Sequence, residues 1–163
     1  MHRTAMDDEA RTAPCQLCGE GLPSLLASPR WRIVRFADPC PLAGWMMLVS
    51  RAHRAGPWEL DDVEAAEFGA VVGGLSLAVR AATGCERTYL LSFNEAVPHM
   101  HLHVVPRHAG DAGTAGWAVA DHARAVLGRT RPAVSAEEAD ALAARVVALA
   151  EPALAAVGFV RGA

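Results

Sequence analysis

The chain has 163 residues, of which 52% are hydrophobic, and its formal net charge is −3. This length and composition predict a single domain, 1–163, and the lack of a basic tract argues against a nucleic-acid partner. All 15 basic residues are arginine, which excludes Schiff-base chemistry and a lysine nucleophile.

Residues 1–13 are polar, and we expect them to be flexible. The motif "CQLC" follows and spaces Cys15 and Cys18 as a chelating pair. Pro14 before the motif and the glycines after it favour a turn over a redox helix. No signal peptide is evident, and the longest apolar run, 42–49, is too short to cross a bilayer. We therefore expect a cytoplasmic protein with no membrane partner and no disulfide framework.

An antiparallel pair of strands is predicted over 31–36 and 45–50, where apolar residues alternate or run together. A helix should follow, because Asp61 can cap its first turn together with Glu64. Phenylalanine, valine and leucine recur there at helical spacing, and Gly84 provides a natural end.

A third strand is predicted over 88–93 and a fourth within 97–107, which Pro106 ends. The chain then becomes glycine-rich until Ser135, which can cap a second long helix ending near Leu154. Strands accompanied by two main helices predict an α+β fold with an antiparallel sheet of about five strands.

The stretch "VPHMHLHVVPR" places His99, His101 and His103 at alternate positions. Period-two alternation is typical of a half-buried strand, so the three imidazoles should share one face. A lone histidine on a strand is more often a satisfied polar residue than a catalyst. Three histidines in strict alternation on one strand indicate a catalytic or metal-binding site.

Two chemistries fit this array. A metal could bind in a His-x-His pattern, with Glu95 as the nearest carboxylate. Alternatively, a neutral imidazole could attack phosphorus while its other nitrogen is held as N–H by a backbone carbonyl. Arg107 and His108 extend the cluster with positive charge, which suits phosphate oxygens better than a dication.

The segment "HMHLHVV" resembles the His-φ-His-φ-His-φ-φ signature of the histidine triad (HIT) superfamily, and "VVPR" is a frequent continuation of it. Upstream, "MMLVSRAH" at 46–53 is similar to the strand in that family that ends in a histidine. The likeness covers 14–108, which leaves 109–163 as a C-terminal extension with a helix. The chain is most similar to the zinc-containing Cys-x-x-Cys type, near diadenosine polyphosphate hydrolases and nucleoside phosphoramidases.

The resemblance implies a nucleotide hydrolase. The middle histidine of the family is the nucleophile, so His101 would attack the α-phosphorus and form a nucleotidyl-histidine that water resolves. His103 would hydrogen-bond the phosphate and help the leaving group. The family commonly forms homodimers through its first helix and a strand, so a homodimer is expected.

The resemblance also implies a structural zinc ion. Its ligands, carried over by position, are Cys15, Cys18, His53 and His99. Two thiolates and two imidazoles form a closed tetrahedral site with no position for water, so the metal would be scaffold and not Lewis acid.

The chain departs from the family in the connection before the triad. Asn94 and Glu95 stand where many members have glycine and glutamine, and a carboxylate there would repel a phosphate unless it were protonated or turned toward Arg107. Both residues remain candidate substrate contacts, and Phe36 and Leu48 are candidates to line the nucleoside pocket. The four tryptophans are more typical of core or interface than of base stacking.

Three alternatives stay open. A nucleotidyltransferase would use the same intermediate and pass the nucleotide to an acceptor. A nucleotide-binding module would keep the pocket without turnover, as the departure at Glu95 suggests. A mononuclear metal enzyme would use His99, His101 and His103 together as ligands.

Overall fold

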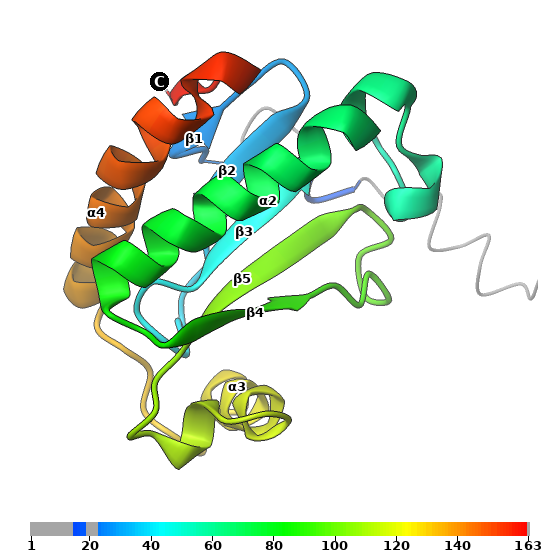
Figure 1. The fold of residues 1–163 in the computed structure, drawn as a ribbon. Helices are drawn as coiled ribbons and strands as arrows, with labels where there is room; N and C mark the ends of the chain where they lie inside the picture. The colour runs from blue at the N-terminus through cyan, green and yellow to red at the C-terminus, as the bar shows by residue number, and fades with distance from the viewer. Residues whose placement is uncertain (1–14, 19–22, 163) are drawn as a thin grey trace, which may run out of the picture.

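The computed structural model describes residues 15–18 and 23–162, and its centre is one antiparallel sheet (Figure 1). The six strands lie in the order β4-β5-β3-β2-β1-β6. Their bounds are Leu26–Ala27 (β1), Trp31–Arg35 (β2), Met46–Ser50 (β3), Arg87–Leu91 (β4), His101–Arg107 (β5) and Val160–Arg161 (β6). The predicted α+β fold with an antiparallel sheet is confirmed. The strands beyond those predicted, β1 and β6, have two residues each, which is too short for a period to show in the sequence. The expected flexibility of 1–13 lies outside the described residues.

The first long helix, α2 (Asp62–Thr83), has the predicted boundaries. The Asp61 carboxylate accepts hydrogen bonds from the backbone N–H groups of Val63 and Glu64, and the Glu64 side chain accepts from the Asp61 N–H. This capping box satisfies donors that the first turn cannot pair internally. At the other end Gly84 adopts φ +69°, a left-handed conformation that glycine reaches without a steric cost.

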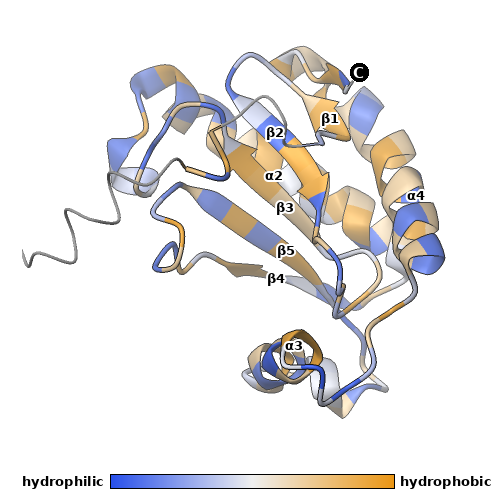
Figure 2. Ribbon diagram, turned by 180° about the vertical axis from the view of Figure 1, so that it is seen from behind, coloured by the Kyte–Doolittle hydropathy of each residue, from blue (hydrophilic) through white to orange (hydrophobic). Residues whose placement is uncertain are grey.

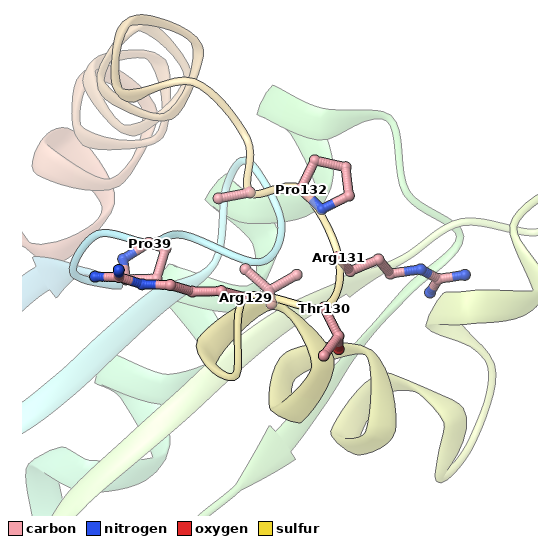
Figure 3. Close-up of a pocket in the computed structure, with 7 residues that line it drawn as sticks. Pro39, Arg129, Thr130, Arg131 and Pro132 are labelled. Atoms are coloured by element: carbon pink, nitrogen blue, oxygen red, sulfur yellow. The ribbon is translucent and has the colours of Figure 1, made fainter.

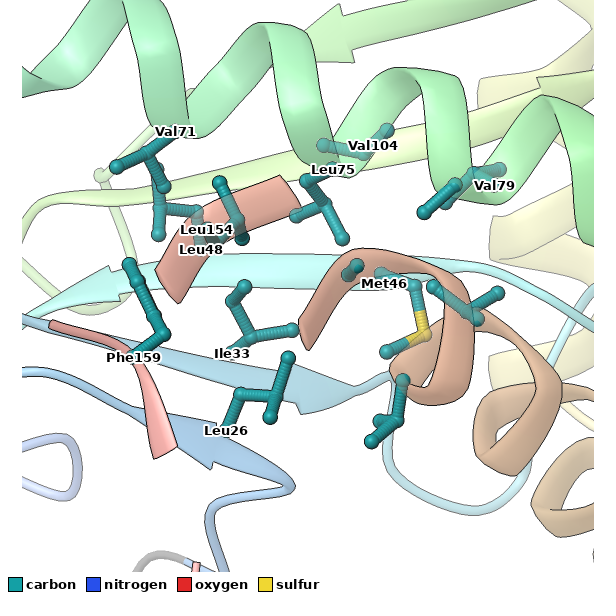
Figure 4. Packing of buried hydrophobic residues seen from close by; sticks show 14 of the residues in the cluster. Leu26, Ile33, Met46, Leu48, Val71, Leu75, Val79, Val104, Leu154 and Phe159 are labelled. Atoms are coloured by element: carbon teal, nitrogen blue, oxygen red, sulfur yellow. The ribbon is translucent and has the colours of Figure 1, made fainter. Parts of the chain in front are cut away.

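The second long helix, α4 (Ala136–Leu154), begins where the Ser135 hydroxyl accepts the Glu138 N–H at 3.2 Å. The helix continues through Pro152 to Leu154, after which the short 3₁₀ helix η3 (Ala155–Val157) leads to β6. α2 and α4 pack against each other and against one face of the sheet, and their apolar side chains meet those of β2, β3 and β5 there (Figure 4).

A third helix was not predicted. The glycine-rich segment forms η2 (Ala112–Thr114), and α3 (Ala118–Leu127) follows it. α3 packs Val119 against Trp45 and Val105 in a second, smaller core. Val105 lies on the sheet face opposite the main core, so α3 covers part of the face that α2 and α4 leave open (Figure 2).

Within the described residues α2 is also the one helix whose length and composition would suffice to cross a membrane. α2 places Val71, Leu75 and Val79 in the core against the sheet, as the core helix of a globular domain does. A further 3₁₀ helix, η1 (Pro57–Glu59), precedes it.

Candidate functional site

The central element of the site is β5, which pairs with β4 on one side and β3 on the other. Leu102 and Val104 point into the main core beneath α2. Because successive side chains of a strand alternate, His101 and His103 point to the opposite face, as predicted. The alternation is visible as hydrophilic and hydrophobic bands along β5 (Figure 2).

The protonation of His101 follows from one contact. Its Nδ1 lies 2.7 Å from the carbonyl oxygen of His99. A carbonyl only accepts hydrogen bonds, so Nδ1 must carry the proton and Nε2 of the neutral ring keeps its lone pair. This is the arrangement that a nitrogen nucleophile requires.

His103 has the complementary arrangement. The indole Nε1–H of Trp45 donates to His103 Nδ1 at 3.0 Å, so the neutral ring carries its proton on Nε2. Burial, with a smaller contribution from the charge of His101, lowers the pKa of His103 to about 4. At neutral pH, His103 is therefore an uncharged donor beside His101, with ring centroids 5.2 Å apart.

His99 does not continue the strand. It lies in a bend before β5, where its own N–H donates to the Val97 carbonyl at 2.7 Å after Pro98 interrupts the ladder. Its fully buried side chain donates from Nε2 to the Ser50 carbonyl at 2.7 Å, which leaves Nδ1 unprotonated. The prediction that all three histidines lie on one extended strand is therefore wrong for His99.

Nδ1 of His99 points into a cluster with the three other predicted metal ligands. The donor atoms of Cys15, Cys18, His53 and His99 all lie within 4.8 Å of one another. His99 Nδ1 is 3.4 Å from each thiol sulfur, and His53 Nδ1 is 3.0 Å from the sulfur of Cys18. The Cys18 N–H donates to the Cys15 carbonyl at 3.2 Å, so the motif forms the predicted turn.

The electrostatics of this cluster suit a cation. Desolvation lowers the pKa of His99, so its ring stays neutral and can act as a ligand. The pKa of the Cys18 thiol is raised, first by desolvation and then by the neighbouring Cys15, and a bound cation would offset both effects on the thiolate form. Two thiols and two imidazoles at these separations match the donor set and geometry of a tetrahedral zinc site.

The two predicted nucleoside-pocket residues lie apart from each other. The ring of Phe36 is on the histidine face, 5.8 Å from that of His103 between centroids. Leu48 is fully buried in the main core and pairs with Leu102, so it faces away from the histidines. A one-residue offset along a strand reverses the face, which the sequence alone did not resolve.

Of the other predicted substrate contacts, one lies beside His101 and the rest lie farther away. Asn94 is half-buried in the connection before His99, with φ +52°, and its amide donates to the Ala55 carbonyl at 3.3 Å. Its Oδ1 accepts from the backbone N–H of His101 at 3.5 Å, so Asn94 lies next to the proposed nucleophile. Glu95 is exposed in the same connection. Arg107 forms an ion pair with Glu86 at the far end of β5 and does not approach Glu95.

His108 follows β5, and its backbone N–H donates to the Thr114 hydroxyl. Its distance along the chain from His101 places it, like Arg107, at the far end of the strand from the proposed nucleophile. The structure therefore brings neither of the two close to His101.

Two recesses flank His103 and were missed by the sequence analysis. One, of about 410 Å³, is lined by Val34 and Met47, and Met47 is the cross-strand partner of His103 on β3. The other, of about 160 Å³, is lined by Leu91, the partner of His103 on β4. Cross-strand pairing is invisible in a single sequence, so nothing signalled either recess.

Another hollow lies between the end of α3 and the segment leading to α4. It is lined by Arg129, Thr130, Arg131 and the two prolines Pro39 and Pro132 (Figure 3). None of these residues belongs to the sheet that carries the histidines. We therefore assign it no part in the histidine site.

The three histidines do not converge on a single metal. His99 directs its free nitrogen at the thiols, whereas the Nδ1 atoms of His101 and His103 are occupied by the His99 carbonyl and by Trp45. In the part of the chain that the structure describes, the one four-membered donor cluster contains only the first of the three histidines. The geometry therefore disfavours a mononuclear metal enzyme with all three histidines as ligands.

No family model and no curated protein matches the chain. Solved structures do. A histidine triad protein from Marinobacter aquaeolei is 22% identical, with a TM-score of 0.60, covering 79% of this chain and 88% of that one. A hypothetical histidine triad nucleotide-binding protein from Sulfolobus tokodaii is 17% identical, with a TM-score of 0.60, covering 82% and 87%.

A Zn-bound histidine triad family protein from Mycobacterium smegmatis is also similar. It is 17% identical, with a TM-score of 0.52, and the match covers 83% of this chain and 87% of that one. At these identities the likeness speaks for the fold. The chain has the histidine triad fold.

Proposed function

We propose that the protein is a histidine triad nucleotide hydrolase that acts at the α-phosphorus through a covalent nucleotidyl-histidine at His101. The contact that carries this proposal is the 2.7 Å hydrogen bond from His101 Nδ1 to the His99 carbonyl. It leaves Nε2 unprotonated on the open face of the sheet, beside a neutral donor, His103.

The reaction has two steps. Nε2 of His101 forms a bond to the α-phosphorus as the bond to the leaving group breaks; the leaving group keeps the electron pair and takes a proton from solvent. Water then attacks phosphorus, releases the nucleoside monophosphate and restores His101. The Nε2–H of His103 donates to a phosphoryl oxygen, where negative charge develops in both steps.

We place the nucleoside in the larger recess beside His103. Its volume of about 410 Å³ falls in the usual range for ligand sites. Val34 and Met47 give it apolar walls, and the charged side chains Arg35, Asp38 and Asp140 also line it. Phe36, whose ring lies near His103, is the predicted pocket residue closest to this position.

We propose that Cys15, Cys18, His53 and His99 hold a structural zinc ion. Bound there, it would tie the Cys15–Cys18 turn and the residues after β3 to the start of β5. The Zn-bound Mycobacterium smegmatis structure supports this assignment.

The test is metal analysis of the purified chain. We expect one zinc per chain in the wild type and loss of stoichiometric zinc in Cys15→Ser. Cys40→Ser removes a buried cysteine outside the cluster and should keep the metal. Full zinc retention in Cys15→Ser would contradict the ligand set.

We further propose that two copies form a homodimer through α2 and β4. β4 is one edge of the sheet, and Leu90 on β4 and Leu77 on α2 are 48% and 65% exposed. An uncovered edge strand beside exposed leucines is a surface that a second copy would cover.

The free thiols of the described cysteines suit a reducing compartment such as the cytoplasm.

The main experiment is mass spectrometry of the protein mixed with a panel of nucleotides, including dinucleoside polyphosphates and nucleoside phosphoramidates. We expect an adduct of nucleoside monophosphate mass that maps to His101, is absent from His101→Ala, and persists in His122→Gln, which alters a histidine on α3. Absence of both adduct and turnover for every nucleotide would exclude the hydrolase and leave the binding module.

Product analysis separates the remaining alternative. If the adduct forms and the nucleotide passes to an added sugar phosphate faster than to water, the protein is a nucleotidyltransferase that uses the same intermediate. If the acceptor changes nothing, it is a hydrolase.

A further inference from the structure

Among the described residues Glu64 is the one buried carboxylate, and the proposed reaction does not use it. Its side chain, in the first turn of α2, is 3% exposed. The Oε2 atom accepts the Asp61 N–H at 2.9 Å and the Nε–H of Arg54 at 3.0 Å. A buried carboxylate is costly unless it is paired and hydrogen-bonded, so this oxygen holds both partners in place.

Arg54 joins this carboxylate to the metal cluster, because it directly follows His53 in the chain. Its Nη2 donates to Asp61 Oδ2 at 3.3 Å, so the guanidinium contacts carboxylate oxygens of two residues in the α2 cap. A planar guanidinium suits two such acceptors at once, and its fixed position restrains the backbone that carries it. The residue after His53 is thus anchored to the start of α2.

The backbone of Arg54 also connects to the second imidazole of the cluster. Its carbonyl accepts the N–H of Met100, the residue that directly follows His99. The Met100 carbonyl accepts the Ser50 N–H at 3.1 Å, and the Ser50 carbonyl accepts from Nε2 of His99 at 2.7 Å. The two residues that follow the proposed imidazole ligands are therefore bonded to each other.

The two imidazoles differ in how they are held. His99 is fully buried, whereas His53 is exposed, so packing alone fixes only the first ring. The rings nevertheless lie nearly perpendicular, at 84°, with centroids 5.2 Å apart. The position of His53 depends on its backbone, which Arg54 ties both to α2 and to the residue before β5.

We infer that Glu64 is a positioning residue for the metal site: through Arg54 it holds His53 at the distance from His99 that one shared ion requires. The inference rests on the proposed zinc site and goes beyond its ligand set. Zinc binding and the first turn of α2 are then coupled in both directions. Removing Glu64 weakens zinc binding, and removing zinc loosens the first turn of α2.

The first experiment measures the affinity of the protein for Zn²⁺ by competition with a chelating dye. Glu64→Ala should bind zinc about tenfold or more weakly than the wild type, the loss typical for a partner that orients a metal ligand. Glu64→Gln keeps an oxygen for the Asp61 N–H but has no charge for Arg54, so its loss should be smaller. This variant provides the measurement if alanine prevents folding.

Ser135→Ala is the matched control. It removes the hydroxyl that caps α4, so it also destabilises the first turn of a long helix, but it lies outside the metal cluster. Its zinc affinity should equal that of the wild type. Equal losses of affinity in Ser135→Ala and Glu64→Ala would trace the effect to general instability and overturn the inference.

A double-mutant cycle tests the route through Arg54. Arg54→Ala should also weaken zinc binding. The double variant Arg54→Ala/Glu64→Ala should bind zinc no more weakly than the weaker of the two single variants, because both residues act through one ion pair. If the two fold-losses multiplied instead, Glu64 would not act through Arg54, and the inference would fail.

Hydrogen exchange gives the reciprocal readout. Chelation of zinc from the wild type should speed amide exchange severalfold in the first turn of α2 and leave the first turn of α4 unchanged. In Glu64→Gln the response of α2 should shrink. Zinc binding equally tight in the wild type and both Glu64 variants would overturn the positioning role and leave the ligand set intact, whereas a wild type without zinc would remove the proposed site itself.

Discussion

Trp45 determines which nitrogen of His103 carries the proton, and it does so from outside the triad motif. Its indole can only donate, so the hydrogen bond of 3.0 Å holds His103 Nδ1 as the acceptor. The motif predicted that His103 takes part, but the tautomer depends on a residue 58 positions earlier in the chain. Sequence spacing contains no information about such a contact.

The lowered pKa of His103 makes stability depend on pH. In the unfolded chain the pKa of histidine is about 6.5, so the unfolded state binds a proton first as the pH falls. The neutral His103 contributes its full stability above about pH 6.5. This contribution is lost progressively as the pH falls toward 4, and the total loss is about 3 kcal/mol.

We expect His103→Gln to reduce this dependence. Urea unfolding between about pH 5 and pH 6.5 should give the wild type a steeper rise in the free energy of unfolding than the variant, by close to one proton. Glutamine keeps an acceptor for Trp45 and does not titrate. Equal slopes would show that His103 is not the group responsible.

At the scale of elements, the caps of the two long helices could be predicted because their signals are local. Asp61 with Glu64, and Ser135 before α4, are short-range patterns whose partners lie within one turn. α3 was missed for the opposite reason. Its position depends on packing of Val119 against Trp45 and Val105, which come from two different strands.

Gly84 ends α2 with φ +69° and leads the chain into β4. Gly84→Ala should lower the free energy of unfolding by about 1 kcal/mol, because a side chain with a β-carbon is strained in the left-handed region. Space is not the limit, since nothing lies within 4 Å of a Cβ built there.

The measurement is urea denaturation of Gly84→Ala beside Gly84→Asn. Asparagine tolerates the left-handed conformation better than alanine, so its loss should be smaller. A larger loss in Gly84→Asn would place the cause in something other than backbone strain.

At the scale of the whole molecule, the proposed dimer is tested by sedimentation equilibrium. Leu90→Arg, at the exposed β4 edge, should convert the dimer to monomer, since a charge there would have to be buried without a partner. Leu149→Glu places a charge on α4, at a leucine 45% exposed outside the proposed interface, and should leave the dimer intact.

The fold class and the four members of the Cys/His cluster could be predicted from the resemblance to the histidine triad family, which rests on the triad, the strand–histidine–helix order and the Cys-x-x-Cys spacing. The same resemblance assigned His99 to the metal site and His101 to the role of nucleophile, but it did not predict the bend in the backbone that separates the two side chains. Pro98 and the bend at His99 turn that imidazole toward the thiols, and the face of Leu48 follows from pairing. These features depend on tertiary contacts between distant strands.

The two recesses on either side of His103 have a consequence for the order of events. A substrate held in both would lie across the strands, so its two fragments would depart by separate exits. In the proposed reaction the leaving group would depart past α3 while the nucleotide stayed attached to His101, and water would enter by the same route. The covalent intermediate would give ping-pong kinetics, and the position of β5 between β3 and β4 would keep the two products on separate paths.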